Sequence, residues 1–238
     1  MNYLQLVQTT LLLLRAGNER LDEPPESITG NKGIAYEVVQ WIKLAELAIQ
    51  SHRSGWLFMT RNTTVDIPAM SRVNNIAASI GDYFSMVAKS GDNDSPFMTV
   101  WQNAGDAEVK CFFYKWMDWS GSVFDREPHG ITALPCRYTI QPDGQLVFDP
   151  TPQGAISCNF NYRAKPVMMD DQDDDAQPVV PEPYHQLIVY WAILKFYCLT
   201  RDKTQELRQK VQVEFDREMT KLYNEQLPAV DAGGTVLA

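Results

Sequence analysis

Residues 34–53 read IAYEVVQWIKLAELAIQSHR, and the spacing of their apolar side chains decides the class of fold. The apolar positions recur every three or four residues, at Ile34, Val38, Trp41, Ile42, Ala45 and Ile49. That period places them on one face of an α-helix. Gly55 follows the pattern, and glycine is typical of the end of a helix. The stretch therefore predicts an amphipathic helix that ends at about residue 53.

The residues before this stretch carry the same period. Their apolar positions are Leu4, Val7, Leu11 and Leu14, which predict a helix over 2–16. Gly17 stands where a helix is commonly capped. A polar loop with two prolines separates this helix from the next. We expect residues 2–53 to form an αα-hairpin.

Helical period returns near the other end of the chain. One stripe contains Leu187, Ile188, Trp191, Leu194 and Cys198, and a second contains Leu207, Val211, Phe215, Met219 and Leu222. The second stripe ends before Pro228. We expect the hairpin of 2–53 to pack on that of 183–226 as one bundle. Residues 229–238 contain two glycines and no period, which predicts a flexible tail.

Between the helical ends the period changes from that of a helix to that of a strand. Side chains alternate between apolar and polar from Ile156 to Arg163, as they do in a half-buried strand. Residues 136–140 and 145–148 flank Gln141-Pro142-Asp143-Gly144, which predicts a tight hairpin turn. Weaker strand signals cover 63–67, 72–78, 83–89, 97–102 and 109–116. We expect six to eight strands in a sandwich-like or partly closed sheet.

These patterns together predict an α+β fold. Residues 1–55 and 181–228 form a discontinuous helical bundle, 56–180 a β-rich insertion, and 229–238 the tail.

Composition excludes several classes of function. The net charge is −9, and the 21 Lys and Arg are scattered, whereas proteins that bind nucleic acid usually carry a basic patch. Double-stranded DNA could pass beside such a protein without specific binding. The four cysteines show no C-x-x-C pair, which favours free thiols in a reducing compartment. No apolar run is long enough to span a bilayer or basic enough at its start to be a signal peptide, so we expect synthesis in the cytoplasm.

The sequence gives no positive argument for catalysis or for a bound cofactor or metal. Asp171, Asp173, Asp175 and Glu182 match positions of a calcium-loop template, but Ala176 stands where the loop needs glycine. A solvated acidic linker is the alternative we prefer. His129 lies in a loop without a nucleophile motif, and the acidic residues suggest no particular catalytic pair.

Aromatic residues cluster in one part of the insertion. The cluster includes Phe112, Tyr114, Trp116 and Trp119, and it is dense enough that part of it should be exposed. Exposed aromatic side chains favour a protein–protein interface over a ligand pocket. Trp116→Ala tests this, since an interface role requires a change in assembly by native mass spectrometry.

The two ends of the chain resemble the head-to-tail adaptor proteins of tailed phages. The residues that carry the resemblance are Tyr3–Val7 with Leu11–Gly17, Ile28–Gly30, Ala35–Ile42 with Ile49-Gln50 and Trp56, and Pro181–Ala192 with Gln226-Leu227-Pro228. It covers roughly 100 residues at the two ends and the hairpin before Pro150, and it does not extend in detail to 60–135. No single motif is specific to this family, but the order and spacing of the motifs together are specific to it.

The resemblance implies a ring of twelve copies below the portal protein, which extends the channel for double-stranded DNA and offers a platform to tail or nozzle proteins. It implies a location in the virion neck. On this view Tyr184 and His185 at the start of the last helical pair, and Val236 and Leu237 in the tail, join the candidate interface residues.

Two other kinds of protein remain open. One is a cell-wall hydrolase carried in a phage tail, which needs a carboxylate pair with one raised pKa. The other is a tail-completion, neck or receptor-binding protein, which should form trimers or hexamers. A ring count by cryo-electron microscopy separates these alternatives.

Overall fold

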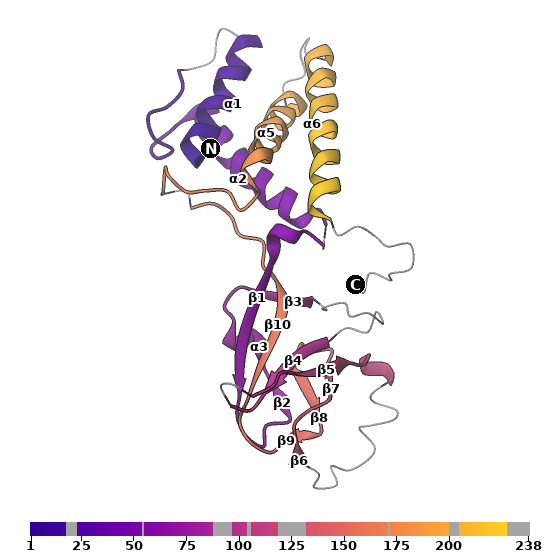
Figure 1. Cartoon of the computed structure of the whole chain (residues 1–238). Helices are drawn as coiled ribbons and strands as arrows, with labels where there is room; N and C mark the ends of the chain where they lie inside the picture. The colour runs from indigo at the N-terminus through magenta and orange to yellow at the C-terminus, as the bar shows by residue number, and fades with distance from the viewer. Residues whose placement is uncertain are drawn as a thin grey trace. The chain divides into compact units, whose positions relative to one another are not determined.

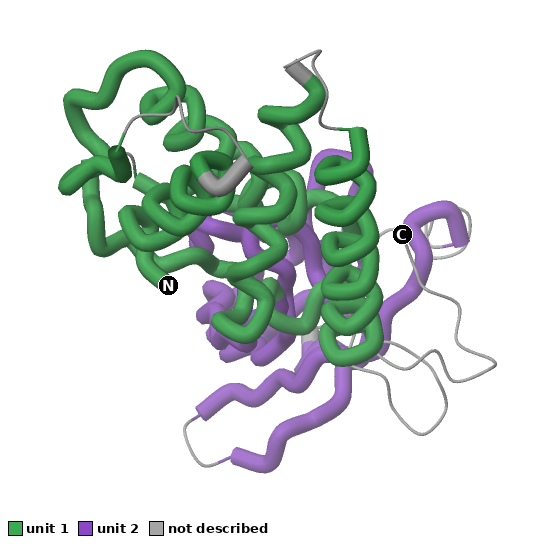
Figure 2. The backbone as a smooth tube through the Cα atoms, turned by 90° about the horizontal axis from the view of Figure 1, so that it is seen from above, with its two compact units in different colours: residues 1–59, 166–238 green, residues 60–165 purple. Residues whose placement is uncertain are grey.

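The computed structural model describes residues 1–17, 23–53, 55–87, 97–103, 106–118, 132–170, 172–199 and 205–227. The chain divides into two compact units (Figure 2). Residues 1–59 and 166–238 form a helical unit, and residues 60–165 form a sheet unit. The α+β class is confirmed. The chain changes unit at residues 60 and 165, whereas the sequence pattern placed the insertion at 56–180.

The helical unit is built around one central helix. Its elements are α1 (Tyr3–Gly17), α2 (Gly33–Ser51), η1 (Leu57–Met59), η2 (Glu182–Tyr184), α5 (His185–Leu199) and α6 (Gln205–Gln226). Helix α5 packs against α1, α2 and α6 (Figure 1). Its side chains Leu187, Val189 and Ala192 are all fully buried although they point in different directions around the helix. A helix covered on several sides has no need of a polar face.

The core of the helical unit is closed at one end by Trp56. Its side chain is fully buried, and its indole N–H donates to the carbonyl of Ile49 at 2.9 Å. The ring stacks on Phe58 and on Tyr223, with a centroid distance of 5.5 Å to each. This stack joins η1 to α6, so it ties the first part of the chain to the last.

The sheet unit contains one curled mixed sheet of eight strands and a separate pair. Its elements are β1 (Thr60–Ile67), β2 (Val73–Asn74), α3 (Ile76–Ser79), β3 (Tyr83–Val87), β4 (Phe97–Trp101), β5 (Val109–Phe113), β6 (Thr132–Ala133), β7 (Arg137–Ile140), β8 (Leu146–Asp149), β9 (Thr151–Pro152) and β10 (Ile156–Ala164). The order is β1-β10-β4-β5-β7-β8-β2, with β3 also on β10 and β6 paired with β9. Only the β5–β7 pair within the large sheet is parallel.

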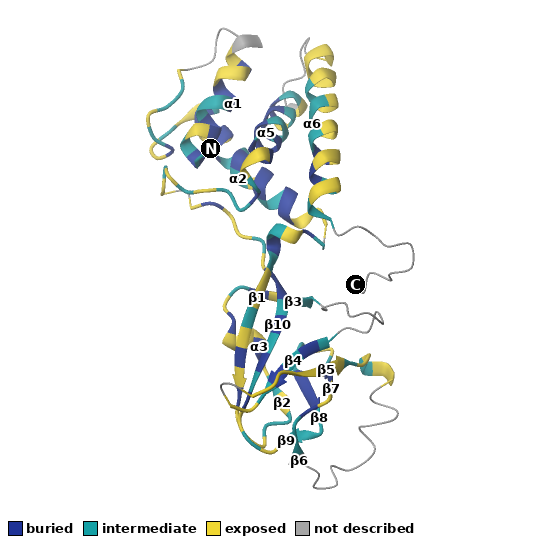
Figure 3. Cartoon of the chain, in the orientation of Figure 1, coloured by how far each residue is buried: buried dark blue, intermediate teal, exposed yellow. Residues whose placement is uncertain are grey.

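Strand β10 is the axis of this sheet. It pairs along its whole length with β1 and on its other side with β4 and β3. Its residues Ile156, Cys158 and Phe160 are buried while the side chains between them are half-buried (Figure 3). The alternation read from the sequence is confirmed from Ile156 to Tyr162, but Arg163, expected on the polar face, is buried.

The predicted hairpin is also confirmed. Strands β7 and β8 pair in antiparallel register, with Ile140 opposite Leu146. The amide of Gly144 donates to the carbonyl of Gln141 at 2.9 Å, and Gly144 has φ +82°. A side chain would be strained in that conformation, which explains the glycine.

Two strand predictions are partly wrong. The strand expected over 109–116 ends at Phe113, and Trp116 lies in a helical turn. Residues 72–78 were expected to be a strand, but only Val73–Asn74 is one, and Ile76–Ser79 is the short helix α3. The side chain of Asn75 accepts a hydrogen bond from the amide of Ala78 and so caps this helix. An N-cap asparagine therefore prevailed over the apolar spacing.

Candidate functional site

Aromatic side chains lie on the outer face of strands β4 and β5. Phe97 stands opposite Phe112 in the register, and their ring centroids are 6.5 Å apart. Met98 and Cys111, one position along each strand, are fully buried on the other face. Phe112 is 40% exposed, so the strand turns a large apolar ring toward solvent.

Cations lie over the rings of this outer face. The Lys110 ammonium is 4.7 Å from the centroid of Phe97, and the Arg137 guanidinium is 5.5 Å from that of Tyr114. Arg137 is also opposite Phe112 in the parallel β5–β7 register. We call Phe97, Lys110, Phe112, Tyr114 and Arg137 the aromatic face. Cation–π contact holds such rings in place, which lowers the entropy lost when a partner covers them.

The structure brings together only part of the predicted aromatic cluster. Phe112 and Tyr114 are exposed, Trp116 is half-buried, and Met117 beside it is 81% exposed. Trp119, Val236 and Leu237 lie outside the described residues. Phe97, Lys110 and Arg137 were missed. The alternation of β4 was a signal for Phe97, but no sequence pattern pairs β5 with β7.

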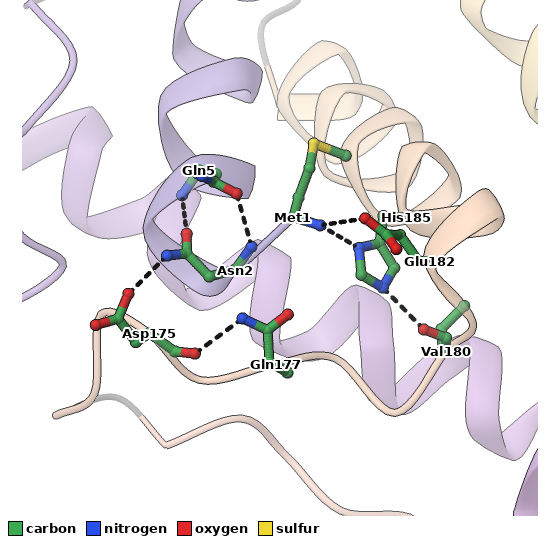
Figure 4. Close-up of polar contacts among 8 residues, drawn as sticks. All are labelled: Met1, Asn2, Gln5, Asp175, Gln177, Val180, Glu182 and His185. Carbon is green, nitrogen blue, oxygen red and sulfur yellow. Dashed lines mark hydrogen bonds and ion pairs between the residues drawn. The ribbon is translucent and has the colours of Figure 1, made fainter.

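Tyr184 and His185 lie in the interior of the helical unit. Each residue is 4% exposed. The His185 ring nitrogen Nδ1 lies 2.8 Å from the amino group of Met1, and Nε2 lies 2.9 Å from the carbonyl of Val180 (Figure 4). The carbonyl requires a proton on Nε2, which leaves Nδ1 to accept from the amino group. The ring therefore joins the start of α1 to the start of α5.

Burial sets the protonation of both side chains. Burial lowers the pKa of His185 below 6.5, and the nearby positive amino group lowers it further. Burial raises the pKa of Tyr184 to about 12, with a further contribution from its hydrogen bond to Glu225. Both groups are thus held neutral inside the fold. Their role in the free chain is to fix the helices, not to present a contact surface.

Two polar side chains of α2 hold the segment that returns from the sheet, residues 166–181. Gln50 donates to the carbonyl of Val167 and accepts from its amide, both at 2.9 Å. Glu46 accepts from the amide of Val179 through Oε1. Both side chains are fully buried. Because this segment has no helix or strand, buried side chains satisfy its backbone.

The acidic loop within this segment forms hydrogen bonds with the amino-terminal region. The Asp174 carboxylate accepts from the amide of Ile28 at 2.7 Å. Asp175 accepts from the side-chain amide of Asn2 at 2.8 Å (Figure 4). The amides of Tyr3 and Leu4 donate to carbonyls of the same loop. Asp174 is therefore more than a residue of a solvated linker, because its half-buried carboxylate binds the amide of Ile28, whereas Asp175 binds Asn2 and stays exposed to solvent.

The buried thiols of the sheet unit are held in their protonated, unreactive form. Burial raises the pKa of Cys158 to about 12 and that of Cys111 further. A thiol is a weak nucleophile and a weak metal ligand until it loses its proton. Within the described ranges no group of three or more His, Cys, Asp or Glu side chains could hold a metal ion. Among the helices described, none has the length and apolarity to cross a membrane.

Comparison with known proteins assigns the chain to a family. No curated protein sequence matches it. A family model described as "SU10 adaptor protein" matches residues 1–236, which is almost the whole chain and includes residues 60–135 that the resemblance at the two ends did not reach. The chain belongs to the SU10 adaptor protein family of phage structural proteins.

Proposed function

We propose that copies of this chain form a ring of twelve below the portal of a tailed phage. The ring extends the channel through which DNA leaves the capsid, and it gives tail or nozzle proteins a surface to dock on. The family match over residues 1–236 is the observation that carries this proposal. An adaptor has to bind one part of the virion on each side, so it needs two docking regions and no active site.

The distribution of charge supports passage of DNA without binding. The helical unit has 19 acidic against 12 basic residues, and the sheet unit has 11 against 9. Excess negative charge repels phosphate at distances within about one Debye length, roughly 8 Å at physiological salt. A channel lined by the helical unit would let DNA slide.

The aromatic face supports a docking role for the sheet unit. Phe112 and Tyr114 are 40% and 43% exposed, while polar side chains fill the outer face of the neighbouring β1–β10 pair. Apolar area of this kind is usually covered by a partner. We assign the aromatic face to tail or nozzle proteins, and the helical unit to the portal and to neighbouring copies.

The experiment is reconstitution on portal rings of the same phage. The purified chain is mixed with portal rings, and particles are imaged by cryo-electron microscopy. The expected result is an added layer of twelve copies on one side of the portal. An added layer of another count overturns the twelvefold ring, and trimers or hexamers without portal binding favour a tail-completion or receptor-binding role. A chain that never binds portal rings overturns the proposal.

A further inference from the structure

Two edges of the helical unit carry apolar side chains that its described residues leave exposed. The first is on α1, where Leu12 and Leu13 are 54% and 44% exposed. The helix carries a single charged residue, Arg15, in its 15 residues. A solvated helix face normally has several charges, so the outer side of α1 has the composition of a surface that becomes buried.

The second edge is on α6. This helix has 22 residues, but only Met219 and Leu222 are buried, both in its second half. In its first half Val213 is 64% exposed and Leu207 is 39% exposed. We call Leu12, Leu13 and Arg15 the α1 edge, and Glu206, Leu207 and Val213 the α6 edge.

The two edges lie on opposite sides of α5. Helix α1 packs on one side of α5 and α6 on the other, with α5 between them (Figure 1). A contact that uses two different surfaces on opposite sides joins copies head to tail, and such contacts generate rings when the rotation closes. Two copies of one surface would instead stop at a dimer.

The two edges also lie at the same end of the helical unit. The bond between Met1 and His185 puts the start of α1 beside the start of α5, and both helices have 15 residues. Helix α6 begins only six residues after α5 ends, so its first turns lie beside the last turns of α5. Figure 1 shows the end of α1, the end of α5 and the start of α6 at one end. Edges at one level can meet without a shift along the helices, which favours a closed ring over a rising filament.

Charge at that end is complementary. Arg15 ends the α1 edge, and Glu206 begins the α6 edge with its side chain 81% exposed. Glu206 already pairs with Lys210 at 2.8 Å within its own helix. A carboxylate has room for a second cation, so Arg15 of a neighbouring copy can join this pair.

We propose that the α1 edge of one copy packs against the α6 edge of the next, and that this contact closes the ring. The inference rests on the proposed function, since it takes from it that copies stand side by side. It adds the surfaces, their head-to-tail order and the residues in contact.

The test uses two variants that each damage one edge. Leu12→Glu with Leu13→Glu places charges in the α1 edge, and Val213→Glu does so in the α6 edge beside Glu214 and Asp216. Each side chain is exposed in the free chain, so folding should be kept, and circular dichroism checks this. Under the conditions that give wild-type rings, native mass spectrometry should show a loss of rings of at least about tenfold for each variant.

Matched controls lie on the same helix faces at the other end of the unit. Gln5→Glu is seven residues before Leu12 and keeps the oxygen that accepts from the Asn2 amide. Asn224→Glu is eleven residues after Val213. Both controls should form rings as the wild-type chain does.

Mixing the two edge variants decides the order of contact. Each variant has one intact edge. A head-to-tail contact therefore gives mixed pairs, with one copy of each variant, and no larger species. A contact between identical surfaces gives no such mixed pair, and that result overturns the inference. Wild-type rings with unchanged assembly of both edge variants overturn the inference alone. A wild-type chain that forms no ring with or without portal overturns the proposed function.

Discussion

The helical unit and the sheet unit differ in what their buried polar side chains do and in which apolar side chains they expose. The helical unit buries Glu46, Gln50 and His185 among its leucines. The sheet unit builds its core from aliphatic side chains, aromatic rings and two thiols, and it turns further rings outward on its aromatic face. The difference teaches that buried polar side chains hold the chain together in the first unit, while both units leave apolar side chains exposed to a partner, aliphatic ones on the helices and aromatic ones on the sheet.

The cause of the difference lies in the backbone. In the sheet unit, neighbouring strands satisfy most backbone groups of β10. In the helical unit, the described residues of 166–181 lie in no helix or strand, so buried side chains of α2 and backbone amides at the start of α1 supply the partners. Buried polar groups cost stability unless they are paired, and this pairing restricts where the segment can lie.

The largest expected effect comes from Trp56→Ala. The change removes a fully buried ring, its bond to Ile49 and its stack on Tyr223. We expect a loss of about 3–5 kcal/mol in the free energy of unfolding of the helical unit. Hydrogen exchange read by mass spectrometry should show faster exchange in α2, with β10 still protected.

Leu57→Ala is the control, because Leu57 is 48% exposed and adjacent in sequence. It should cost less than about 1 kcal/mol. Equal loss of protection in α2 and β10 after Trp56→Ala would show that the two units unfold together and would contradict the expectation that they unfold separately.

A smaller effect, with a defined pH dependence, is expected for Glu46→Gln. Burial raises the pKa of Glu46 from 4.5 to about 7, and Oε2 is buried without a hydrogen-bond partner. The folded chain therefore binds a proton more readily than the unfolded chain, so this residue destabilises the fold above pH 7. The penalty disappears as pH falls from 7 to 4.5. It amounts to about 3 kcal/mol at most.

Urea unfolding at pH 5 and pH 8 measures this. The glutamine variant should be more stable than wild type by about 1–3 kcal/mol at pH 8, with a much smaller difference at pH 5. Gln40→Glu on the half-buried side of the same helix serves as a charge control. A variant less stable at pH 8 than at pH 5, relative to wild type, would show that the carboxylate is favoured by its surroundings.

The effect of His185 on stability should have the opposite pH dependence. Its pKa is lowered by burial, so the unfolded chain binds the proton more readily and stability is lost as pH falls through 6.5. In a Glu46→Gln background, the free energy of unfolding should fall between pH 7 and pH 5. Adding His185→Gln should remove that slope and cost about 1 kcal/mol at pH 7 through its hydrogen bonds. A slope unchanged by His185→Gln would assign it to other groups.

The sequence predicted elements better than it predicted contacts. The four long helices follow from apolar period alone, and β10 follows from alternation, because each pattern is local. The short helix α3 was missed because one asparagine cap decided it. The burial of His185 was missed because its partner Met1 is 184 positions away. Likewise Arg137 joins Phe112 only through a parallel strand pair, and local pattern carries no information about strand order.

The smallest effect on stability, and the sharpest test of the comparison, is Phe112→Ala. Phe112 is 40% exposed, so its loss should cost less than about 1 kcal/mol in the free energy of unfolding. If the aromatic face docks tail proteins, the variant should still join portal rings while binding of the tail or nozzle protein weakens about tenfold or more. The control is Phe84→Ala, since Phe84 is 56% exposed on β3, outside the aromatic face. Both affinities can be measured by biolayer interferometry on assembled rings. Unchanged tail binding by the Phe112 variant would place the docking surface elsewhere, and a loss of portal binding as well would show that the two roles share one surface.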